Sequence, residues 1–451
     1  MLAPQNPLAS GSPADYWDLF QSGAVWSKAA KINEFGVSAR LITDSPDDKL
    51  RQAFQYLKAH NIKLRIGILS LKGSNDPNGP GHGVEGFAAN PPGEAILVAK
   101  RVKSLGGVVD FVDLDEPLWY GHYYSEKNAI HAPIADLARQ AGATIRAVRT
   151  IFPSAKYGEA EPVQGIPDAV WRSDMQEWFS ALQAAAGQPL SSFFIDIQWD
   201  LPMRQRISGV IDLLAKSKIG CGIIFNGYGA AGSDATWVRS GEEHIQVYNS
   251  LFARSPIVVS ISSWNPNPTR ILPSSSSTAL AHLVDYHFSP AATQPAPLPF
   301  RQMVKAGCGY FYSADPAEIK AHEAKGWKLD TGVNPNPPYT NDIAGGIYRS
   351  RQSAIALVPL YRFYLSSRHK YAYAATASGQ SMLLTSGYTR DAVAGYVFPS
   401  EDSGGIPFHR FFDSPSGSYI YATNPVVCAK LAKAGCLDQG VECYLPPGWV
   451  P

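Results

Sequence analysis

The sequence of 451 residues has almost no net charge and few charged residues. It carries 39 Lys+Arg against 38 Asp+Glu, and charged residues make up only 17% of the chain. A nucleic-acid-binding protein usually has a basic excess or a basic stripe, so this balance argues against a nucleic-acid partner. The sequence also lacks an apolar run of the ~18–20 residues that cross a bilayer, so we expect no membrane insertion.

Two further absences limit the possible chemistry. A metal-dependent hydrolase built on a barrel usually takes ligands from a His-x-His pair, and none of the 10 histidines forms such a pair. An aldolase that forms a Schiff base needs a lysine in a late strand, and the late apolar segments have none. We therefore expect no metal and no cofactor.

Hydrophobic residues, at 45% of the chain, are numerous enough to bury a large core. Cys221 stands alone in an apolar stretch and reads as a buried thiol. The other cysteines lie in the last third of the chain and allow three pairings: Cys308, Cys428, Cys436 and Cys443. The first residues show no signal peptide. The clustered cysteines favour a secreted or extracellular protein whose leader has been removed over a cytosolic one.

A proline-rich segment divides the sequence into two parts. Residues 289–299 include four prolines, which predicts a stiff linker at 290–299. Before it, at 1–289, short apolar strands alternate with helical patterns. After it, at 300–451, the sequence is aromatic and rich in turns.

The first part predicts repeated β/α units. Strands are expected at 1–4, 35–42, 62–69, 108–114, 156–161, 193–199, 222–226 and 257–262. Helices are expected between them, at 47–60, 94–105, 134–152, 168–186, 203–216 and 242–252. Eight such units predict a (β/α)8 TIM barrel of the α/β class. A doubly wound sheet is the alternative fold, but no phosphate-binding glycine fingerprint follows the first strands.

The second part contains an internal repeat. Pro359-Leu-Tyr-Arg-Phe-Tyr364 returns as Pro407-Phe-His-Arg-Phe-Phe412, 48 residues later, and the register then holds without a gap. An earlier copy lies 61 residues before the first of these, with its extra residues in a predicted loop at 333–339. Three copies predict an all-β or β-rich pseudo-threefold domain, with a β-trefoil-like arrangement first and a propeller-like one second. The repeated residues Arg362, Tyr373 and Tyr421 are expected to belong to its core.

Carboxylates gather at the predicted strand ends. Side chains of a barrel strand alternate between the interior and the helix layer, and reactive groups collect at the C-terminal ends of the strands. Because Val112 and Leu114 are apolar, they are expected to face the helices, so Asp113 and Asp115 point inward and Glu116 ends the strand. The same argument places further residues inside the barrel or at its mouth: Arg40, Glu159, Glu161, Asp196, Gln198, Asp200 and Asn226.

These acidic groups have a second interpretation. Burying carboxylates costs several kcal/mol unless they are paired, so stability alone would not select the whole set. Some of them are alternatively expected to cap the following helix or to bind Arg40, Arg65 or Arg270.

Aromatic residues follow the same strand ends. The rings of Trp119, Tyr123, Tyr228 and Trp264 are expected to stack on the C–H faces of sugars, although any one of them could instead be core. A long glycine-rich loop at 72–86 is expected either to close over a cleft with His82 and Glu85 reaching in, or to be a plain surface loop.

The tripeptide Asp115-Glu116-Pro117 resembles the Asn-Glu-Pro strand end of retaining (β/α)8 glycoside hydrolases. The resemblance implies that Glu116 is the general acid/base. It departs from the family twice, because Asp115 replaces an Asn that contacts the sugar and because strand seven ends in Asn226 where the family has a Glu nucleophile. The second carboxylate is then Asp196 or Glu159.

The C-terminal repeats, with a Tyr-Arg-Phe-Tyr start and a Tyr-x-Tyr-Ala-x-Thr middle, are similar to a bacterial three-repeat domain. That domain follows many secreted cell-wall and polysaccharide hydrolases. The similarity implies export and an accessory, glycan-binding role.

The sequence therefore predicts a glycoside hydrolase that cleaves a bacterial or plant polysaccharide with a pair of carboxylates. The alternative is a non-catalytic carbohydrate-binding protein on a barrel scaffold; both have a polysaccharide or oligosaccharide partner. Separation of the carboxyl groups would decide the stereochemistry, with ~5–5.5 Å for retention and ~6.5–9.5 Å for inversion. Strands four and six are not adjacent, which favours the wider gap.

Overall fold

The computed structural model describes residues 1–451 except residues 10, 200, 202, 230, 253–255, 257, 333–341, 353–355 and 447–451 and the side chain of residue 402. Eight parallel strands form a closed barrel in the order β1-β10-β9-β8-β7-β6-β3-β2. Their bounds are β1 Leu2–Ala3, β2 Glu34–Ser38, β3 Lys63–Ile68, β6 Phe111–Asp115, β7 Lys156–Glu161, β8 Ser192–Asp196, β9 Gly220–Phe225 and β10 Val258–Ser262. The predicted TIM barrel is confirmed and the doubly wound alternative is wrong.

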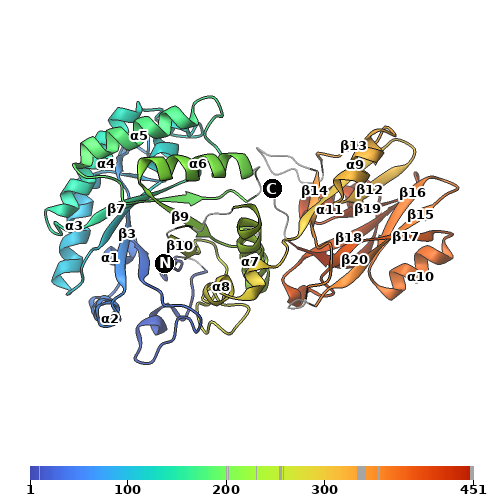
Figure 1. The fold of residues 1–451 in the computed structure, drawn as a ribbon, viewed down its shortest axis with the longest axis horizontal. Coiled ribbons are helices and arrows are strands. Elements are labelled where there is room, and N and C mark those ends of the chain that lie inside the picture. Colours follow the sequence, from blue (N-terminus) through green and yellow to red (C-terminus); the bar gives the residue numbers. More distant parts are fainter. Residues whose placement is uncertain are drawn as a thin grey trace. The chain divides into compact units, whose positions relative to one another are not determined.

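Helices surround the strands of the barrel (Figure 1). Those of the first compact unit are α1 Ala39–Asp44, α2 Asp47–Ala59, α3 Pro91–Ser104, α4 Ile134–Arg149, α5 Trp171–Ala186, α6 Arg204–Ser217 and α8 His282–His287. Helix α4 shows why they pack there, because its buried Leu137, Ala141, Ile145 and Val148 recur at helical spacing on one face. Two short segments complete the set, the 3-10 helix η1 at Tyr16–Phe20 and the π-helix η2 at Trp119–Tyr123.

The second barrel strand is shorter than predicted. Ser38 ends β2 and caps the next helix, because its side-chain oxygen accepts a hydrogen bond from the N–H of Leu41 at 3.2 Å. Residues 39–42, predicted to continue the strand, therefore begin α1. A small two-stranded sheet, β4 at Leu71–Lys72 with β5 at Phe87–Ala88, forms the base of the glycine-rich loop.

The chain separates into two compact units whose division differs from the predicted boundaries. The first unit comprises Met1–Gln198, Pro202–Asn226 and Phe252–Phe288, and the second comprises Trp199–Leu201, Gly227–Leu251 and Ser289–Pro451. The second unit thus includes helix α7, Asp234–Leu251. The predicted linker is partly ordered as the 3-10 helix η3, Pro290–Thr293, which is bound to α7 through Asn249 Nδ2 donating to Ala292 O at 3.0 Å.

The second unit contains three copies of one strand–strand–helix–strand motif. The first copy consists of β11 Leu298–Lys305, β12 Gly309–Ser313, α9 Pro316–Glu323 and β13 Lys328–Leu329, with β14 Ile343–Ile347 added. The second consists of β15 Val358–Leu365, β16 Lys370–Ala374, α10 Ala377–Thr385 and β17 Thr389–Val397. The third follows the short η4 Glu401–Ser403 and consists of β18 Ile406–Asp413, β19 Ser418–Ala422, α11 Pro425–Lys433 and β20 Leu437–Leu445. Each copy has its own antiparallel sheet. The predicted β-trefoil-like arrangement is not confirmed, because every copy also contains a helix. The predicted loop at 333–339 lies outside the described residues.

A ring of three tyrosines joins the copies at their centre. The hydroxyl of Tyr373 donates to the carbonyl of Tyr312 at 2.7 Å and accepts from its N–H at 2.8 Å. Tyr421 makes the same pair of bonds to Tyr373, and Tyr312 makes it to Tyr421. All three side chains are at most 1% exposed. The prediction that Tyr373 and Tyr421 are core is confirmed, as it is for the buried Arg362, which binds Glu318 and Asp391.

The five cysteines form no disulfide in the structure, and all of them lie among the described residues. The pairings that the sequence allowed are therefore not observed. Cys221 is the second residue of β9 and is only partly buried. Within the described ranges, we find no helix with both the length and the apolar character needed to cross a membrane.

Candidate active site

The interior of the barrel is organised around one arginine. Arg65 of β3 is 1% exposed, and its guanidinium binds Asp113 of β6 at 2.6 Å and Glu34 of β2. It also donates to Ser192 Oγ at 3.2 Å and lies 3.8 Å from the centre of the Phe111 ring. Asp113 therefore points inward, as predicted, but it pairs with Arg65, as the second interpretation of the carboxylates allowed.

Gly158 shows which side of β7, the strand next to β6, faces this arginine. A Cβ placed on Gly158 would lie 2.6 Å from both Asp113 Oδ1 and Ser192 Oγ. The position therefore faces the barrel interior and has no room for a side chain. Because side chains alternate along a strand, Glu159 and Glu161 must face the helix layer.

The predicted inward orientation of the two glutamates is thus wrong. Glu159 is fully buried, and both of its carboxyl oxygens accept from Trp178 Nε1 of α5, at 2.9 and 2.8 Å. Glu161 accepts from the backbone N–H groups of Leu118 and Trp119 at 2.7 and 3.0 Å. It caps the segment after β6, so the capping interpretation is the correct one for this residue.

Glu116 and Asp196 are brought together at the C-terminal mouth of the barrel. Asp196 ends β8 and Glu116 directly follows β6. The two carboxyl groups act on each other: Glu116 lowers the pKa of Asp196, and the charge of Asp196 raises the pKa of Glu116. Glu116 has a φ of +48°, in the left-handed region that an ordinary L residue rarely adopts. Backbone strain of this kind collects at functional sites.

Asp115 and Glu85 add two more carboxylates to this cluster. Both contribute negative charge that acts on Glu116 and Asp196. Glu85 arrives on the glycine-rich loop and, after burial, is the group that most raises the pKa of Tyr120. Gly86 lets the loop approach, because it has a φ of +82° and a Cβ there would lie 2.8 Å from Asp115 O. The loop therefore lies close to the end of β6, while Glu85 itself is exposed. Closure of the loop over a cleft stays a prediction.

The cluster holds its protons more tightly than free carboxylic acids do. Burial, with the charge of Asp196 next in importance, raises the pKa of Glu116 to about 11. Burial also raises the pKa of Asp196 to about 7, against the lowering effect of Glu116, and burial with Glu85 raises the pKa of Asp115 to about 7. No cation among the described residues counters these shifts. At neutral pH the pair Glu116–Asp196 therefore retains a proton.

A cavity of about 490 Å³ opens on the side of β1, β2 and β3, and Asp115 is the member of the cluster that lines it. Its lining includes Asp113, Asp115, Arg40 and Trp264. Trp264 is 49% exposed, so its ring is available to a ligand. Sites for small ligands typically have volumes of ~300–1,000 Å³.

Arg40 reaches this cavity from a different element than predicted. The prediction placed it inside a strand, but it lies on α1, with a side chain that is 71% exposed and bound to Asp44 at 3.3 Å. An exposed helical arginine of this kind is not an interior group of the barrel.

The remaining predicted residues lie outside the carboxylate cluster. His82 stays within its own loop, where Nδ1 lies 3.1 Å from Ser74 O, so the prediction that it reaches in is wrong. The Tyr123 hydroxyl donates to Asp174 of α5, and the ring of Trp119 stacks on Tyr123 and covers Gly165. These two rings are therefore packed against the protein.

Four more predicted residues follow β8 and β9. Asn226 directly follows β9, as predicted. The backbone of Gln198 is held by the side chain of Gln164, and Gln198 Oε1 is buried with no partner among the described residues. Tyr228 belongs to the second unit, where its N–H donates to Ser240 Oγ. Asp200 lies outside the described residues.

Sequence reasoning missed the roles of two residues. Arg65 was considered only as a partner for carboxylates, although its position between Leu64 and Ile66 in an apolar strand already indicates that it faces inward. Tyr120 was one of several aromatic residues after Glu116, and nothing in the sequence singles out its interaction with Glu85. Within the described residues, no group of three or more His, Cys, Asp or Glu side chains is arranged to hold a metal ion.

Comparison with known proteins gives one family match and several distant likenesses. The model of a family described as Domain of unknown function (DUF5648) matches residues 300–446, about a third of the chain. No curated protein matches the sequence. The solved structures that resemble this chain include a psychrophilic glycoside hydrolase family 10 endo-β-1,4-xylanase, which is 12% identical over 64% of this chain and 95% of that chain, with a TM-score of 0.38.

Two other xylanases are similar at the same level. An intracellular xylanase from Thermoanaerobacterium saccharolyticum is 16% identical over 59% of this chain and 85% of that chain, with a TM-score of 0.37. A thermostable mutant of a xylanase from Cellvibrio japonicus is 8% identical over 58% and 86%, with a TM-score of 0.37. The closed strand order described above, rather than these likenesses, defines the fold of this chain.

Proposed function

We propose that the barrel is a glycoside hydrolase in which Glu116 is the proton donor. One observation carries the proposal: two carboxyl groups with raised pKa values, Glu116 and Asp196, act on each other at the C-terminal mouth of a (β/α)8 barrel, where Asp196 ends β8 and Glu116 follows β6. Catalytic residues of such barrels lie at this mouth. Two carboxyl groups, one holding a proton and one ionised, are what cleavage of a glycosidic bond requires.

In this proposal the roles follow from the pKa values. Glu116, whose pKa is raised to about 11, keeps its proton at neutral pH and gives it to the departing glycosidic oxygen. Asp196, with a pKa of about 7, is partly ionised and either attacks the anomeric carbon or takes a proton from the attacking water. Asp115 and Glu85 help to keep the proton on Glu116 through their negative charge.

The cavity suggests where the substrate would lie. A sugar unit in it would contact Trp264 through a ring face and Asp115 or Asp113 through its hydroxyl groups. The glycosidic oxygen would then accept the proton of Glu116, the residue that directly follows Asp115. A polysaccharide or oligosaccharide is therefore the proposed substrate, and an accessory glycan-binding role for the three-repeat unit and an extracellular location stay predictions.

A non-catalytic carbohydrate-binding protein is the second candidate, and one observation favours it. Neither Glu116 nor Asp196 is among the residues that line the 490 Å³ cavity. The carboxyl separation expected from the strand order, ~6.5–9.5 Å, stays a prediction. Hydrolysis requires that the scissile bond of a substrate in the cavity reaches these two groups.

The experiment that tests the proposal is release of reducing ends from a panel of bacterial and plant polysaccharides. Glu116→Gln and Asp196→Asn are compared with Glu159→Gln, a matched control on the neighbouring strand whose carboxyl faces α5. Loss of turnover in the first two variants, with activity retained in the third, supports the hydrolase. Saturable glycan binding without any product, unchanged by Glu116→Gln, supports the binding protein.

A further inference from the structure

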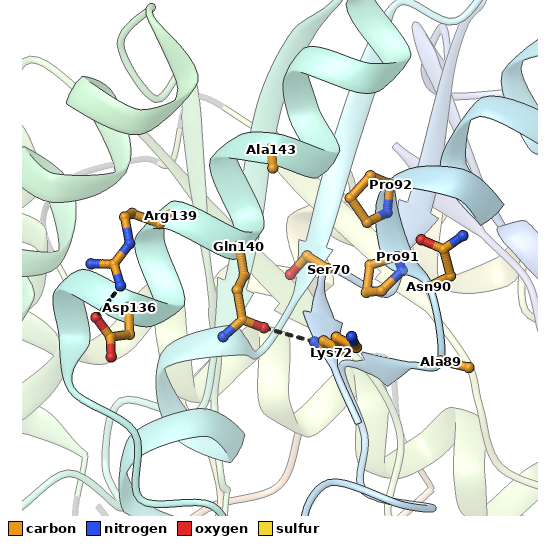
Figure 2. A pocket seen from close by; sticks show the side chains of 10 residues that line it. All are labelled: Ser70, Lys72, Ala89, Asn90, Pro91, Pro92, Asp136, Arg139, Gln140 and Ala143. Carbon is orange, nitrogen blue, oxygen red and sulfur yellow. Dashed lines mark hydrogen bonds and ion pairs between the residues drawn. The ribbon is translucent and has the colours of Figure 1, made fainter. Parts of the chain in front are cut away.

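A second cavity in the first unit lies between the start of α3 and one face of α4, and the candidate active site does not use it. Its volume is about 610 Å³, within the ~300–1,000 Å³ range of small-ligand sites. Its walls include Ser70 and Lys72 from the chain after β3, Pro91 and Pro92 of α3, and Arg139 and Gln140 of α4 (Figure 2).

Ser70 gives the cavity a buried polar group that needs a partner. The residue is 0% exposed, and its hydroxyl has no hydrogen-bond partner among the described residues. In the view of Figure 2 it lies between Gln140 and Pro91. A buried hydroxyl without a partner is unfavourable, so a polar ligand atom at this place would be stabilising.

The other polar groups around the cavity mostly donate hydrogen bonds. Gln140 uses its Oε1 to accept from the N–H of Lys72 at 2.8 Å, which leaves its NH2 group as a donor. The ammonium group of Lys72 forms no ion pair with any described residue, whereas Arg139 is neutralised by Asp136 (Figure 2). The site thus offers one unpaired positive charge and several donors, which suits a ligand with oxygen acceptors and a single negative charge.

The walls favour a sugar over an inorganic anion. Pro91 and Pro92 line the cavity with apolar ring carbons, and Ala143 adds an apolar patch on α4. Phosphate sites at helix ends use the first N–H groups of the helix, but α3 begins with these two prolines, which have none. We propose that this cavity binds a hexuronic acid unit of a glycan, with its carboxylate on Lys72, its hydroxyl groups on Ser70 and Gln140, and its ring against the prolines.

The proposal is tested by calorimetric titration of the full chain with methyl β-D-glucuronide, methyl β-D-glucoside and inorganic phosphate. We expect the glucuronide to bind at least about tenfold more tightly than the glucoside, because a charge-assisted bond to Lys72 is lost in the latter. Lys72→Met, which keeps most of the side-chain stem, is expected to remove this preference. Lys100→Met, on an exposed position of α3 outside the cavity, is the matched control and is expected to change nothing.

Ser70→Ala gives a second, independent readout. It removes a hydroxyl that is unsatisfied in the free protein, so the thermal midpoint without ligand should stay the same or rise, while the affinity for the glucuronide falls. Equal binding of both sugars, no saturable binding, or full affinity in Lys72→Met would overturn the proposal. Phosphate binding that depends on Lys72 without binding of the glucuronide would show an anion site and would overturn the assignment to a sugar.

This inference does not depend on hydrolysis. Glu116→Gln is expected to bind the glucuronide as the wild type does, since Glu116 does not line the cavity. A protein without turnover but with this binding would contradict only the proposed function. A protein with turnover but without this binding would contradict only the second site.

Discussion

The centre of the three-repeat unit and the mouth of the barrel differ in how their buried polar groups are paired. In the three-repeat unit, each buried tyrosine hydroxyl of the central ring both donates and accepts, and each repeated arginine meets an acid: Arg301 with Asp342, Arg362 with Glu318, and Arg410 with Glu442. At the barrel mouth, Asp115, Glu116 and Asp196 lie together without a cation among the described residues. Polar networks in which every group is hydrogen-bonded stabilise a fold. Buried acids without a cation have raised pKa values, and such values are typical of functional sites.

The barrel itself contains both arrangements. Arg65 neutralises Glu34 and Asp113 at the level of β2, β3 and β6, and the unpaired acids lie beyond it, at and after the strand ends. The paired group belongs to the stability of the barrel. The unpaired group is the candidate for chemistry.

The largest effect is expected from the acid that holds the proton. Glu116→Gln keeps the shape of the side chain but cannot give up a proton, so we expect kcat on a polysaccharide substrate to fall by ~10²–10⁴-fold. Glu159→Gln, which changes an acid that binds Trp178 instead, should stay within a few fold of the wild type. Equal losses of kcat in the two variants would contradict the claim that the acid at the barrel mouth, and not the acid that faces the helix layer, takes part in the chemistry.

Loss of Arg65 should damage the fold rather than the chemistry. Arg65→Met leaves two buried carboxylates without their partner, so we expect the free energy of unfolding to fall by ~3–5 kcal/mol in denaturant titrations. The double variant with Asp113→Asn should recover part of this loss. A single variant as stable as the wild type would show that the pair does not stabilise the barrel.

The tyrosine ring predicts a smaller and repeated effect. Tyr421→Phe removes one hydroxyl and leaves the N–H and C=O of Tyr373 without their side-chain partner, which should cost ~1–3 kcal/mol of unfolding free energy. Tyr312→Phe and Tyr373→Phe should cost similar amounts because the three bonds are equivalent. Markedly unequal costs would contradict the threefold equivalence.

The smallest effect concerns pH. The native state keeps the Glu116 proton up to a pKa of about 11, whereas the unfolded chain releases it near 4.5, so the native state binds more protons between these values. Stability should therefore fall as pH rises above 4.5, and Glu116→Gln should remove this part of the dependence. We expect the variant to match the wild type at low pH and to exceed it by ~1–2 kcal/mol near neutral pH, allowing for solvent screening. Parallel stability curves for the two proteins would contradict the raised pKa.

The barrel could be predicted from the sequence because apolar residues recur at a different spacing in its strands than in its helices. Lys156–Glu161 has the same bounds in the prediction and in the structure, and the apolar alternation of Val112 and Leu114 correctly placed Asp113. The error at Glu159 and Glu161 came from reading the acids as inward. The buried Tyr157 lies on the same face of β7 as Glu159 and Glu161, which is the face toward the helices. Gly158 lies on the opposite face and leaves the interior space to Arg65.

The candidate site was predictable in its members but not in its contacts. The tripeptide at residues 115–117 indicated Glu116, and the strand end indicated Asp196. No local pattern reveals the left-handed backbone of Glu116, and the approach of the loop that carries Glu85 depends on how it folds back at Gly86. The spacing of the tyrosines, by contrast, was sufficient to predict three equivalent copies, because each copy repeats the same local structure.

The central claim is that Glu116 keeps its proton above neutral pH. Infrared difference spectroscopy of the wild type against Glu116→Gln at pH 8, where a free carboxyl group with a pKa near ~4.3 is ionised, reads this directly. The account predicts a band from a protonated carboxyl group in the wild type that is absent from the variant. A wild-type spectrum with only ionised carboxylates at that pH would contradict it.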